Sequence, residues 1–296
     1  MKGILLVDKP PGITSHDVVD HVRKAAGIRR VGHTGTLDPR ATGLLILCVG
    51  GATRLSEHLT ALDKTYEGTM RLGIVTDSFD LDGAVLEQRP VPELTADDVQ
   101  QACDRYTGDI EQIPPMVSAV KIGGQRLYKM ARQGETVERK PRPVKVHEFS
   151  VLGYAAPDAH IRVRCTSGTY VRSLCHDVGA ALGCGAALAC LRRTWVGSYC
   201  VDKAVPLGAL TNRESVEAHL TPIHKALDMP EVIVRPACRK MVVAGSTLTR
   251  RDCENDCPVE SGWVQIKTAS GELLALGLVK PGPAELCIHP KRVLGD

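Results

Sequence analysis

Residues Gly32-His33-Thr34-Gly35-Thr36-Leu37-Asp38-Pro39 place one acidic side chain in a loop of small residues, directly before a proline. The glycines permit close backbone approach and positive φ angles, and Pro39 disfavours helical geometry at Asp38. Such a loop can present a carboxylate rigidly to a cleft. Nucleophile, general base and metal ligand are then all open roles for Asp38, and a turn-forming role is the common structural alternative.

The apolar run Leu44–Val49 follows this loop and predicts a fully buried strand. The short apolar run 4–7 predicts another strand, and alternation predicts strands at 64–72 and 160–165. Helical spacing with capping signals predicts helices at 15–26, after the pair 50–51, at 95–106 and from 169 onward. Ser15 is expected to cap the first helix and Gly27 to end it. These elements predict an α+β domain with a mixed, mostly antiparallel sheet, flanking helices and a central cleft.

The chain changes character after Met229-Pro230. Short apolar segments at 232–234, 259–266 and 273–279 are separated by glycines, which predicts a small all-β module in the form of a barrel. We therefore expect one large domain over residues 1–228 and a small one over residues 229–296.

Composition excludes several classes of protein. With 43% hydrophobic and 24% charged residues, the chain can bury a core and is not disordered. No apolar run reaches the roughly 20 residues of a membrane helix, and the short apolar run near Met1 predicts a strand and not a signal peptide. A soluble cytoplasmic protein is the expectation.

No motif for a metal or a cofactor stands out. The 11 cysteines include no CxxC pair, and Cys253 and Cys257 lack two further ligands for zinc. Cys165, Cys175 and Cys190 lie in apolar patterns and are expected to be buried thiols. The sequence contains no GxxxxGK[ST], GxSxG, HExxH or GxGxxG motif. We expect side-chain chemistry without a cofactor.

Two further clusters carry charge. Asp77, Asp80 and Asp82 resemble half of a calcium loop, but Ser78 and Arg89 stand at ligand positions, so a turn between two strands is predicted. The net charge is only +3, yet residues 121–145 form a basic arm that predicts phosphate binding, with a solvated surface element as the alternative. Its basic residues are Lys121, Arg126, Lys129, Arg132, Arg139, Lys140, Arg142 and Lys145.

Five ordered motifs together resemble the TruB family of tRNA pseudouridine synthases, over residues 3–205. The first is the Asp38 loop, extended to Ala41-Thr42-Gly43. The others are Leu6-Val7-Asp8-Lys9-Pro10-x-Gly12, Lys64-Thr65-Tyr66, Ser167-Gly168-Thr169-Tyr170-Val171-Arg172, and Gly183-Cys184-Gly185-Ala186 with Leu191-Arg192-Arg193. The C-terminal module resembles a PUA domain, a small RNA-binding barrel.

The resemblance implies isomerisation of uridine to pseudouridine at position 55 in the TΨC loop of tRNA, with the base flipped into a pocket. It makes Asp38 the catalytic aspartate, Tyr66 the residue that stacks on the flipped base, and Arg172 the partner that pairs with Asp38 and lowers its pKa. From pattern alone, Tyr66 would be a core residue and Arg172 a surface arginine.

The same resemblance assigns supporting roles. Tyr170 and Leu191 would wall the pocket, and His33 would pack into the RNA loop. Lys9 would contact a phosphate or support the Asp38 loop, and Asp80 would order the cleft. The basic arm, an insertion at about 120–148, would hold the tRNA stem-loop through Lys121, Arg126, Lys129 and Arg132.

Two other functions stay open. One is a tRNA-folding chaperone in which modification is secondary, and the other is a guide-RNA-dependent synthase, against which the basic insertion and short C-terminus argue. We expect a monomer that needs tRNA but no obligatory protein partner.

Overall fold

The computed structural model describes residues 1–116, 118, 121–122, 125–127, 130, 137–282 and 286–294 of the 296-residue chain. The strands of its main sheet are β1 (Gly3–Lys9), β2 (Val31–His33), β3 (Thr42–Val49), β4 (Lys64–Leu72), β7 (Gly108–Gln112), β10 (Arg142–Ala155), β11 (Asp158–Cys165), β12 (Ala186–Val196), β13 (Tyr199–Cys200), β14 (Val205–Pro206) and β15 (Thr221–Pro222). The α-helices around it are α1 (Ser15–Ala26), α2 (Ser56–Ala61), α3 (Ala96–Asp104), α5 (Val171–Ala181) and α6 (Arg213–Ala218).

In the described part of the chain, the main sheet runs in the order β14-β1-β3-β12-β4-β11-β10-β7. Strands β2, β13 and β15 pair beside this path. The pairs β1–β14 and β3–β12 are parallel, while the other pairs are antiparallel. The predicted α+β fold with a mixed, mostly antiparallel sheet is confirmed.

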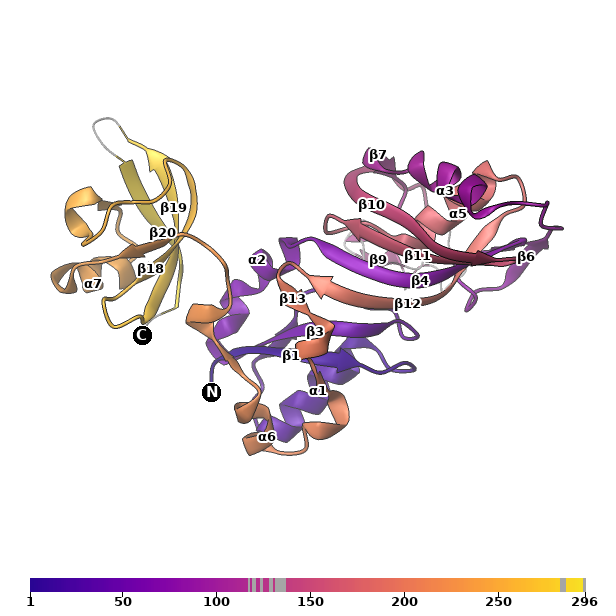
Figure 1. The fold of residues 1–296 in the computed structure, drawn as a ribbon. Coiled ribbons are helices and arrows are strands. Elements are labelled where there is room, and N and C mark those ends of the chain that lie inside the picture. Colours follow the sequence, from indigo (N-terminus) through magenta and orange to yellow (C-terminus); the bar gives the residue numbers. More distant parts are fainter. Residues whose placement is uncertain are drawn as a thin grey trace.

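Strand β3 is buried on both faces, as its continuous apolar sequence predicts. Leu45 and Leu47 pack in a core with α1 and α6, while Leu44 and Ile46 pack in a second core that α2 lines. Figure 1 shows α1 and α6 together on one side of β1 and β3. Both faces of the sheet are therefore packed beside the loop that carries the first motif.

The N-cap of helix α1 lies one residue before the predicted one. Thr14 is the N-cap and forms a capping box with Asp17, whereas Gly27 ends the helix in the left-handed conformation as predicted. Ser15, expected to be the cap, is buried instead. Its hydroxyl donates to the carbonyl of Leu37 at 3.0 Å and accepts from the Leu37 amide at 2.8 Å. Ser15 thus ties the helix to the residue before Asp38.

The other half of the sheet is covered by α3 and α5, which share a core with β4, β10, β11 and β12 (Figure 1). Thr95 caps α3 as predicted. Helix α5 begins at Val171 with Tyr170 as its N-cap, two residues later than expected from Thr169. After β3 the chain forms a 3₁₀ helix (Gly50–Leu55) before α2, where one continuous helix was expected.

Two short hairpins project from this body. They are β5 (Ile74–Thr76) with β6 (Val85–Gln88), and β8 (Lys121–Ile122) with β9 (Gln125–Arg126). The turn predicted for the three aspartates lies between β5 and β6, so that prediction is confirmed. Cys165 and Cys175 are buried as expected, but Cys190 is exposed. A register shift in β12 between Leu188 and Cys190 turns this thiol to the outer face.

The C-terminal module is a curled sheet in the order β16-β18-β19-β20-β17, a half-barrel where a barrel was predicted. Its elements are β16 (Glu231–Ile233), α7 (Arg239–Val243), β17 (Leu248–Thr249), β18 (Gly262–Lys267), β19 (Leu273–Pro281) and β20 (Leu286–Val293). The module contacts α2. The rings of Trp263 and His58 meet edge-on with their centroids 4.4 Å apart, and Arg292 pairs with Glu57 at 2.6 Å.

We expect Gly179→Ala to lower the free energy of unfolding by about 1–3 kcal/mol. Gly179 lies on α5, and a Cβ atom there would overlap the backbone nitrogen of Ala186 at the start of β12. Backbone atoms cannot move aside without separating the helix from the sheet. Chemical denaturation would measure the change. Gly153→Ala is the matched control, because a Cβ atom at Gly153 meets nothing within 4 Å. Equal stability of the two variants would contradict this packing argument.

Candidate active site

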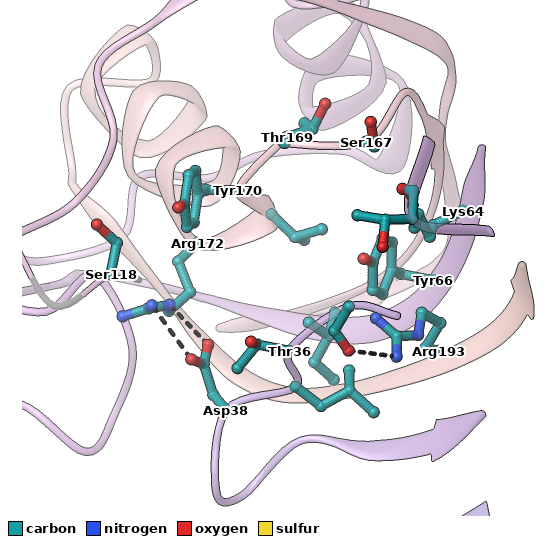
Figure 2. Close-up of a pocket in the computed structure, with 16 residues that line it drawn as sticks. Thr36, Asp38, Lys64, Tyr66, Ser118, Ser167, Thr169, Tyr170, Arg172 and Arg193 are labelled. Carbon is teal, nitrogen blue, oxygen red and sulfur yellow. Dashed lines mark hydrogen bonds and ion pairs between the residues drawn. The ribbon is translucent and has the colours of Figure 1, made fainter. Parts of the chain in front are cut away.

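A pocket of about 250 Å³ opens between the two covered halves of the main sheet. It is bounded by the Asp38 loop, the end of α2, strands β4 and β12, and the segment leading into α5. Figure 2 shows Asp38 and Arg172 at one end, and Tyr66, Lys64 and Arg193 at the other. The lining residues are Gly35, Thr36, Leu37, Asp38, Thr60, Lys64, Tyr66, Ser118, Ser167, Gly168, Thr169, Tyr170, Val171, Arg172, Leu191 and Arg193.

The Asp38 loop is held from behind by Lys9. This side chain is fully buried, and its ammonium donates to the carbonyls of Pro10 at 3.0 Å, Pro39 at 2.9 Å and Ala41 at 2.8 Å. Burial lowers the pKa of Lys9 to about 8, with the Asp38 carboxylate acting in the opposite direction. Of the two roles expected for Lys9, its contacts fit support of the loop and not a phosphate contact.

Arg172 binds two carboxylates at once. Its Nε lies 3.1 Å from Oδ2 of Asp38, and its Nη1 lies 3.2 Å from Oδ2 of Asp80. Nη2 lies 3.5 Å from Oδ1 of Asp38, and Nη1 also donates to the carbonyl of Ser78 at 3.0 Å. The Arg172 side chain is only 4% exposed, whereas that of Asp38 is 44% exposed. A buried cation thus fixes the direction of a carboxylate that faces the pocket.

The net effect on Asp38 differs from the expectation. Partial enclosure raises the pKa of the Asp38 carboxyl above its ordinary value, and the nearby Asp80 and Asp82 carboxylates add to this. Arg172 acts in the expected direction and lowers this pKa, but burial outweighs it. The Asp38 carboxylate is therefore a stronger base than an exposed aspartate.

Asp80 is positioned by its own turn. Oδ1 of Asp80 accepts hydrogen bonds from the Ser78 hydroxyl at 2.5 Å and from the Asp82 amide at 3.1 Å, and the Thr76 hydroxyl donates to its carbonyl at 2.7 Å. Phe79, between these partners, has a φ of 66°. The left-handed conformation costs a non-glycine residue roughly 1–2 kcal/mol. Asp80 contacts Arg172 at this end of the pocket, and the supporting role expected for it stays a prediction.

Tyr66 and Arg193 lie together at the opposite end. Arg193 is 2% exposed, and it donates to the carbonyls of Leu44 at 2.8 Å and Gly35 at 3.1 Å. Burial raises the pKa of the Tyr66 phenol, which the Arg193 cation and its hydrogen bond to the hydroxyl oppose. Arg193 therefore connects the Asp38 loop to the aromatic wall, a link that sequence analysis missed.

Lys64 is a second buried cation that sequence analysis missed as a site residue. Its ammonium donates to the carbonyls of Thr60 and Leu62, both at 2.5 Å, and burial lowers its pKa to about 8. A signal existed for both residues, because Lys64 lies two positions before Tyr66 on β4, and Arg193 two positions after Leu191 on β12. Side chains two apart on a strand share a face.

Tyr170 and Leu191 complete the wall. The backbone of Tyr170 is fixed by Gln112, whose side-chain amide accepts from its N–H at 2.7 Å and donates to its carbonyl at 3.0 Å. Leu191 pairs with Gly68 of β4, and a Cβ atom at Gly68 would overlap the carbonyl oxygen of Cys190. A larger residue at position 68 would push β12 and its pocket residues outward.

Other expected site residues lie elsewhere. His33, on β2, is half-buried beside the loop, where its Nδ1 accepts from the Gly35 amide at 3.4 Å, but it does not line the pocket. Of the basic arm, the backbones of Lys121 and Arg126 pair in the β8–β9 hairpin. Their side chains, and the whole of Lys129 and Arg132, lie outside the described residues.

The described residues contain neither a metal-binding cluster nor a membrane-spanning helix. No group of three or more His, Cys, Asp or Glu side chains among them could hold a metal ion. None of their helices is long and apolar enough to cross a membrane.

Comparison with known proteins places this geometry in a family. A model described as TruB family pseudouridylate synthase (N terminal domain) matches residues 23–171, and one described as tRNA pseudouridylate synthase B C-terminal domain matches residues 172–228. The chain is similar to a tRNA pseudouridine synthase B of Opitutus terrae, with 49% identity over 76% of this chain and 95% of that one. It is also similar to one of Thermobifida fusca, with 44% identity over 96% of both chains.

Solved structures agree with this assignment. A chain in a Cbf5-Nop10-Gar1 complex is 28% identical with a TM-score of 0.77, over 99% of this chain and 84% of that one. A chain in an H/ACA RNP bound to a substrate RNA containing 2'-deoxyuridine is 25% identical with a TM-score of 0.76, over 99% of this chain and 85% of that one. Because the family models span residues 23–228 and the relatives match 76% and 96% of the chain, this protein belongs to the TruB family of pseudouridylate synthases, which isomerise uridine to pseudouridine.

Proposed function

We propose that this enzyme acts on uridine 55 in the TΨC loop of tRNA, using Asp38 as its catalytic carboxylate and no cofactor. The observation that carries the proposal is the position of the Asp38 carboxylate. It faces the pocket, and the buried guanidinium of Arg172 holds it there, with Nε 3.1 Å from Oδ2. The choice of tRNA rests on the curated relatives, which are named tRNA pseudouridine synthase B.

The reaction conserves every atom of the uridine. The bond from N1 of uracil to C1′ of the ribose breaks, the base turns, and C5 bonds to C1′. The proton on C5 leaves, and N1 takes one up. Positive charge develops at C1′ as the first bond breaks, so a carboxylate beside the ribose stabilises the transition state. Asp38 supplies that charge without a metal or an organic group.

The remaining pocket residues hold the substrate. Tyr66 stacks on the flipped uracil, a contact that contributes about 1–3 kcal/mol per base. Tyr170 and Leu191 enclose the base and exclude water, which strengthens the pairing of Asp38 with Arg172. Arg172 fixes the direction of the carboxylate, and Asp80 fixes the guanidinium from its other side. These roles are the ones that the family resemblance implies, and of its two expected roles Lys9 takes the support of the Asp38 loop.

Contacts outside the pocket complete the proposal. Residues 1–228 form the catalytic domain, and residues 229–296 form a PUA-like RNA-binding domain. The basic arm and His33 hold the stem-loop through phosphates and unstacked bases, which positions the RNA without reading its sequence. We propose a cytoplasmic monomer that needs no protein partner.

A guide-RNA-dependent synthase is the second candidate, because the solved structures that match include H/ACA particles. Identity favours the first candidate, since relatives named as tRNA enzymes reach 44–49% and those particles 25–28%. Turnover of a bare tRNA transcript by the chain alone would decide for the tRNA enzyme, whereas a requirement for added RNA or protein would decide against it.

Asp38→Asn should reduce pseudouridine formation on a tRNA transcript by at least about 10³-fold, because the amide keeps the shape but loses the charge. Binding of tRNA should stay within a few-fold, as measured by filter binding. Asp20→Asn, on the surface of α1, is the control and should turn over normally. Retained turnover in Asp38→Asn would refute the assignment. Refolding of tRNA that survives this substitution would reveal a chaperone activity beside the catalysis.

Arg172→Lys should move the acid limb of the kcat profile to higher pH. Arg172 lowers the pKa of Asp38, and a lysine ammonium cannot bind two carboxylates through a planar fork. With less compensation, the already raised pKa of Asp38 rises further, and activity that needs the carboxylate disappears at a higher pH as the solution is acidified. Single-turnover rates across pH would measure the shift. An acid limb that stays in place would show that Asp38 does not titrate in this step.

Tyr66→Leu should lower kcat/KM by about 5- to 150-fold, the value of one lost stack. Tyr66→Phe keeps the flat ring and loses one hydrogen bond to Arg193, so kcat/KM should stay within about fivefold of the wild type. Steady-state kinetics on the same transcript would compare the two variants. Equal losses in both would assign the role of Tyr66 to its hydroxyl and not to stacking.

A further inference from the structure

An aromatic stack lies directly behind the pair formed by Arg172 and Asp80. The ring of Phe79 lies on the imidazole of His176, with centroids 4.0 Å apart and planes 22° apart. Phe79 sits between Ser78 and Asp80, and both of these neighbours bind the Arg172 guanidinium. The residue that forms the stack therefore lies between the two residues of this turn that contact the cation.

His176 belongs to the same helix as Arg172. The two residues are four positions apart on α5, so their side chains lie one turn apart on one face of the helix. One helix thus holds the turn through two of its side chains: Arg172 binds Asp80 and the Ser78 carbonyl, and His176 stacks on Phe79. The separation of the two contacts resists rotation of the turn about the guanidinium, which a single ion pair would permit.

The backbone of Phe79 is attached to the sheet as well. Its carbonyl accepts from the Leu188 amide at 3.0 Å, and the Leu81 amide donates to the Leu188 carbonyl at 3.0 Å. Leu188 lies on β12, three residues before Leu191, and Leu191 lines the pocket. The turn is consequently fixed between α5 and β12, the two elements that supply Arg172 and Leu191.

Two unfavourable features accompany this arrangement. Phe79 adopts a φ of 66°, which a bulky residue avoids unless its surroundings impose it. His176 also has a buried Nδ1 that no group in the described part of the chain binds, although an unpaired buried polar atom opposes folding. Backbone strain that the surrounding contacts impose is common where a side chain must be held in one direction for function.

We infer that Phe79 and His176 are positioning residues, whose stack holds the Asp80 turn so that Arg172 aims Asp38 into the pocket. This inference rests on the proposed roles of Asp38 and Arg172. It adds two residues to the machinery that neither the motifs nor the pocket lining contains.

The test is a double-mutant cycle on kcat with a bare tRNA transcript. Phe79→Ala should lower kcat by about 10- to 100-fold, the range for a small displacement of a reacting group, with KM within twofold. Asp80→Asn should lower kcat as well. Because Phe79 acts through Asp80, the double variant should be no slower than Asp80→Asn alone. The single variants Phe79→Tyr and His176→Phe each keep two stacked rings, so their kcat should stay within about threefold of the wild-type value.

Leu86→Ala is the matched control, since Leu86 is exposed on β6 of the same hairpin. Leu86→Ala should leave kcat unchanged, and the double variant with Asp80→Asn should have the kcat of Asp80→Asn alone. Melting temperatures would identify any variant that fails to fold, and Phe79→Leu, which keeps the bulk without the ring stack, then replaces Phe79→Ala.

Three outcomes would overturn the inference. They are an unchanged kcat in Phe79→Ala, independent multiplication of the Phe79 and Asp80 effects, and a loss that Phe79→Tyr shares. Each of these leaves the proposed function intact if Asp38→Asn is inactive. Turnover by Asp38→Asn would instead remove the proposed function itself, so the two failures are distinguishable.

Discussion

The geometry of the pocket depends on one buried guanidinium that binds two carboxylates. Removing Arg172 from water is costly, and that cost is met only while Asp38 at 3.1 Å and Asp80 at 3.2 Å remain in place. Because the two carboxylates belong to separate loops, each loop must be held independently of the cation. The surrounding structure holds the Asp38 loop and the Asp80 turn separately.

The first support is the frame behind Asp38. Strands β1 and β3 are buried on both faces, so the loop between α1 and β3 starts from rigid elements. Lys9 satisfies three carbonyls around the loop, and Ser15 exchanges two hydrogen bonds with Leu37. These are buried polar groups with their partners in place, and such groups rigidify the backbone that they join. The second support is the β5–β6 turn, which its own side chains close around Asp80.

Sequence analysis predicted the elements well where periodicity was long. Alternation over residues 64–72 and 160–165 and the apolar run 44–49 identified strands that the structure contains. It failed where tertiary contacts compete with local chemistry. Ser15 has the residue type of an N-cap, yet Thr14 takes that position because the Ser15 hydroxyl is needed by Leu37. The contact between Ser15 and Leu37 joins residues 22 apart and has no local pattern, although Thr14 and Asp17 themselves have the spacing of a capping box.

The candidate site shows the same division. Motifs could identify Asp38, Tyr66 and Arg172, because their spacing is a property of the chain. They could not identify Arg193 as the link between two motifs, since its partners Leu44 and Gly35 offer only backbone carbonyls. The direction of the Asp38 pKa was also out of reach. It is the outcome of burial against the Arg172 charge, and burial is set by residues from several distant segments.

Arg172 and Asp38 differ strongly in exposure, and this difference decides which of the two an RNA substrate can reach. Arg172 is 4% exposed and Asp38 is 44% exposed, so the cation is inaccessible to an incoming anion while the carboxylate is open. An RNA substrate carries phosphates that would compete for an exposed arginine. With the guanidinium enclosed by Asp38, Asp80 and the Ser78 carbonyl, the backbone of the RNA cannot displace the carboxylate. In the proposed reaction the base and the ribose are the parts of the substrate that meet Asp38, so the exposed carboxylate lies where positive charge develops at C1′.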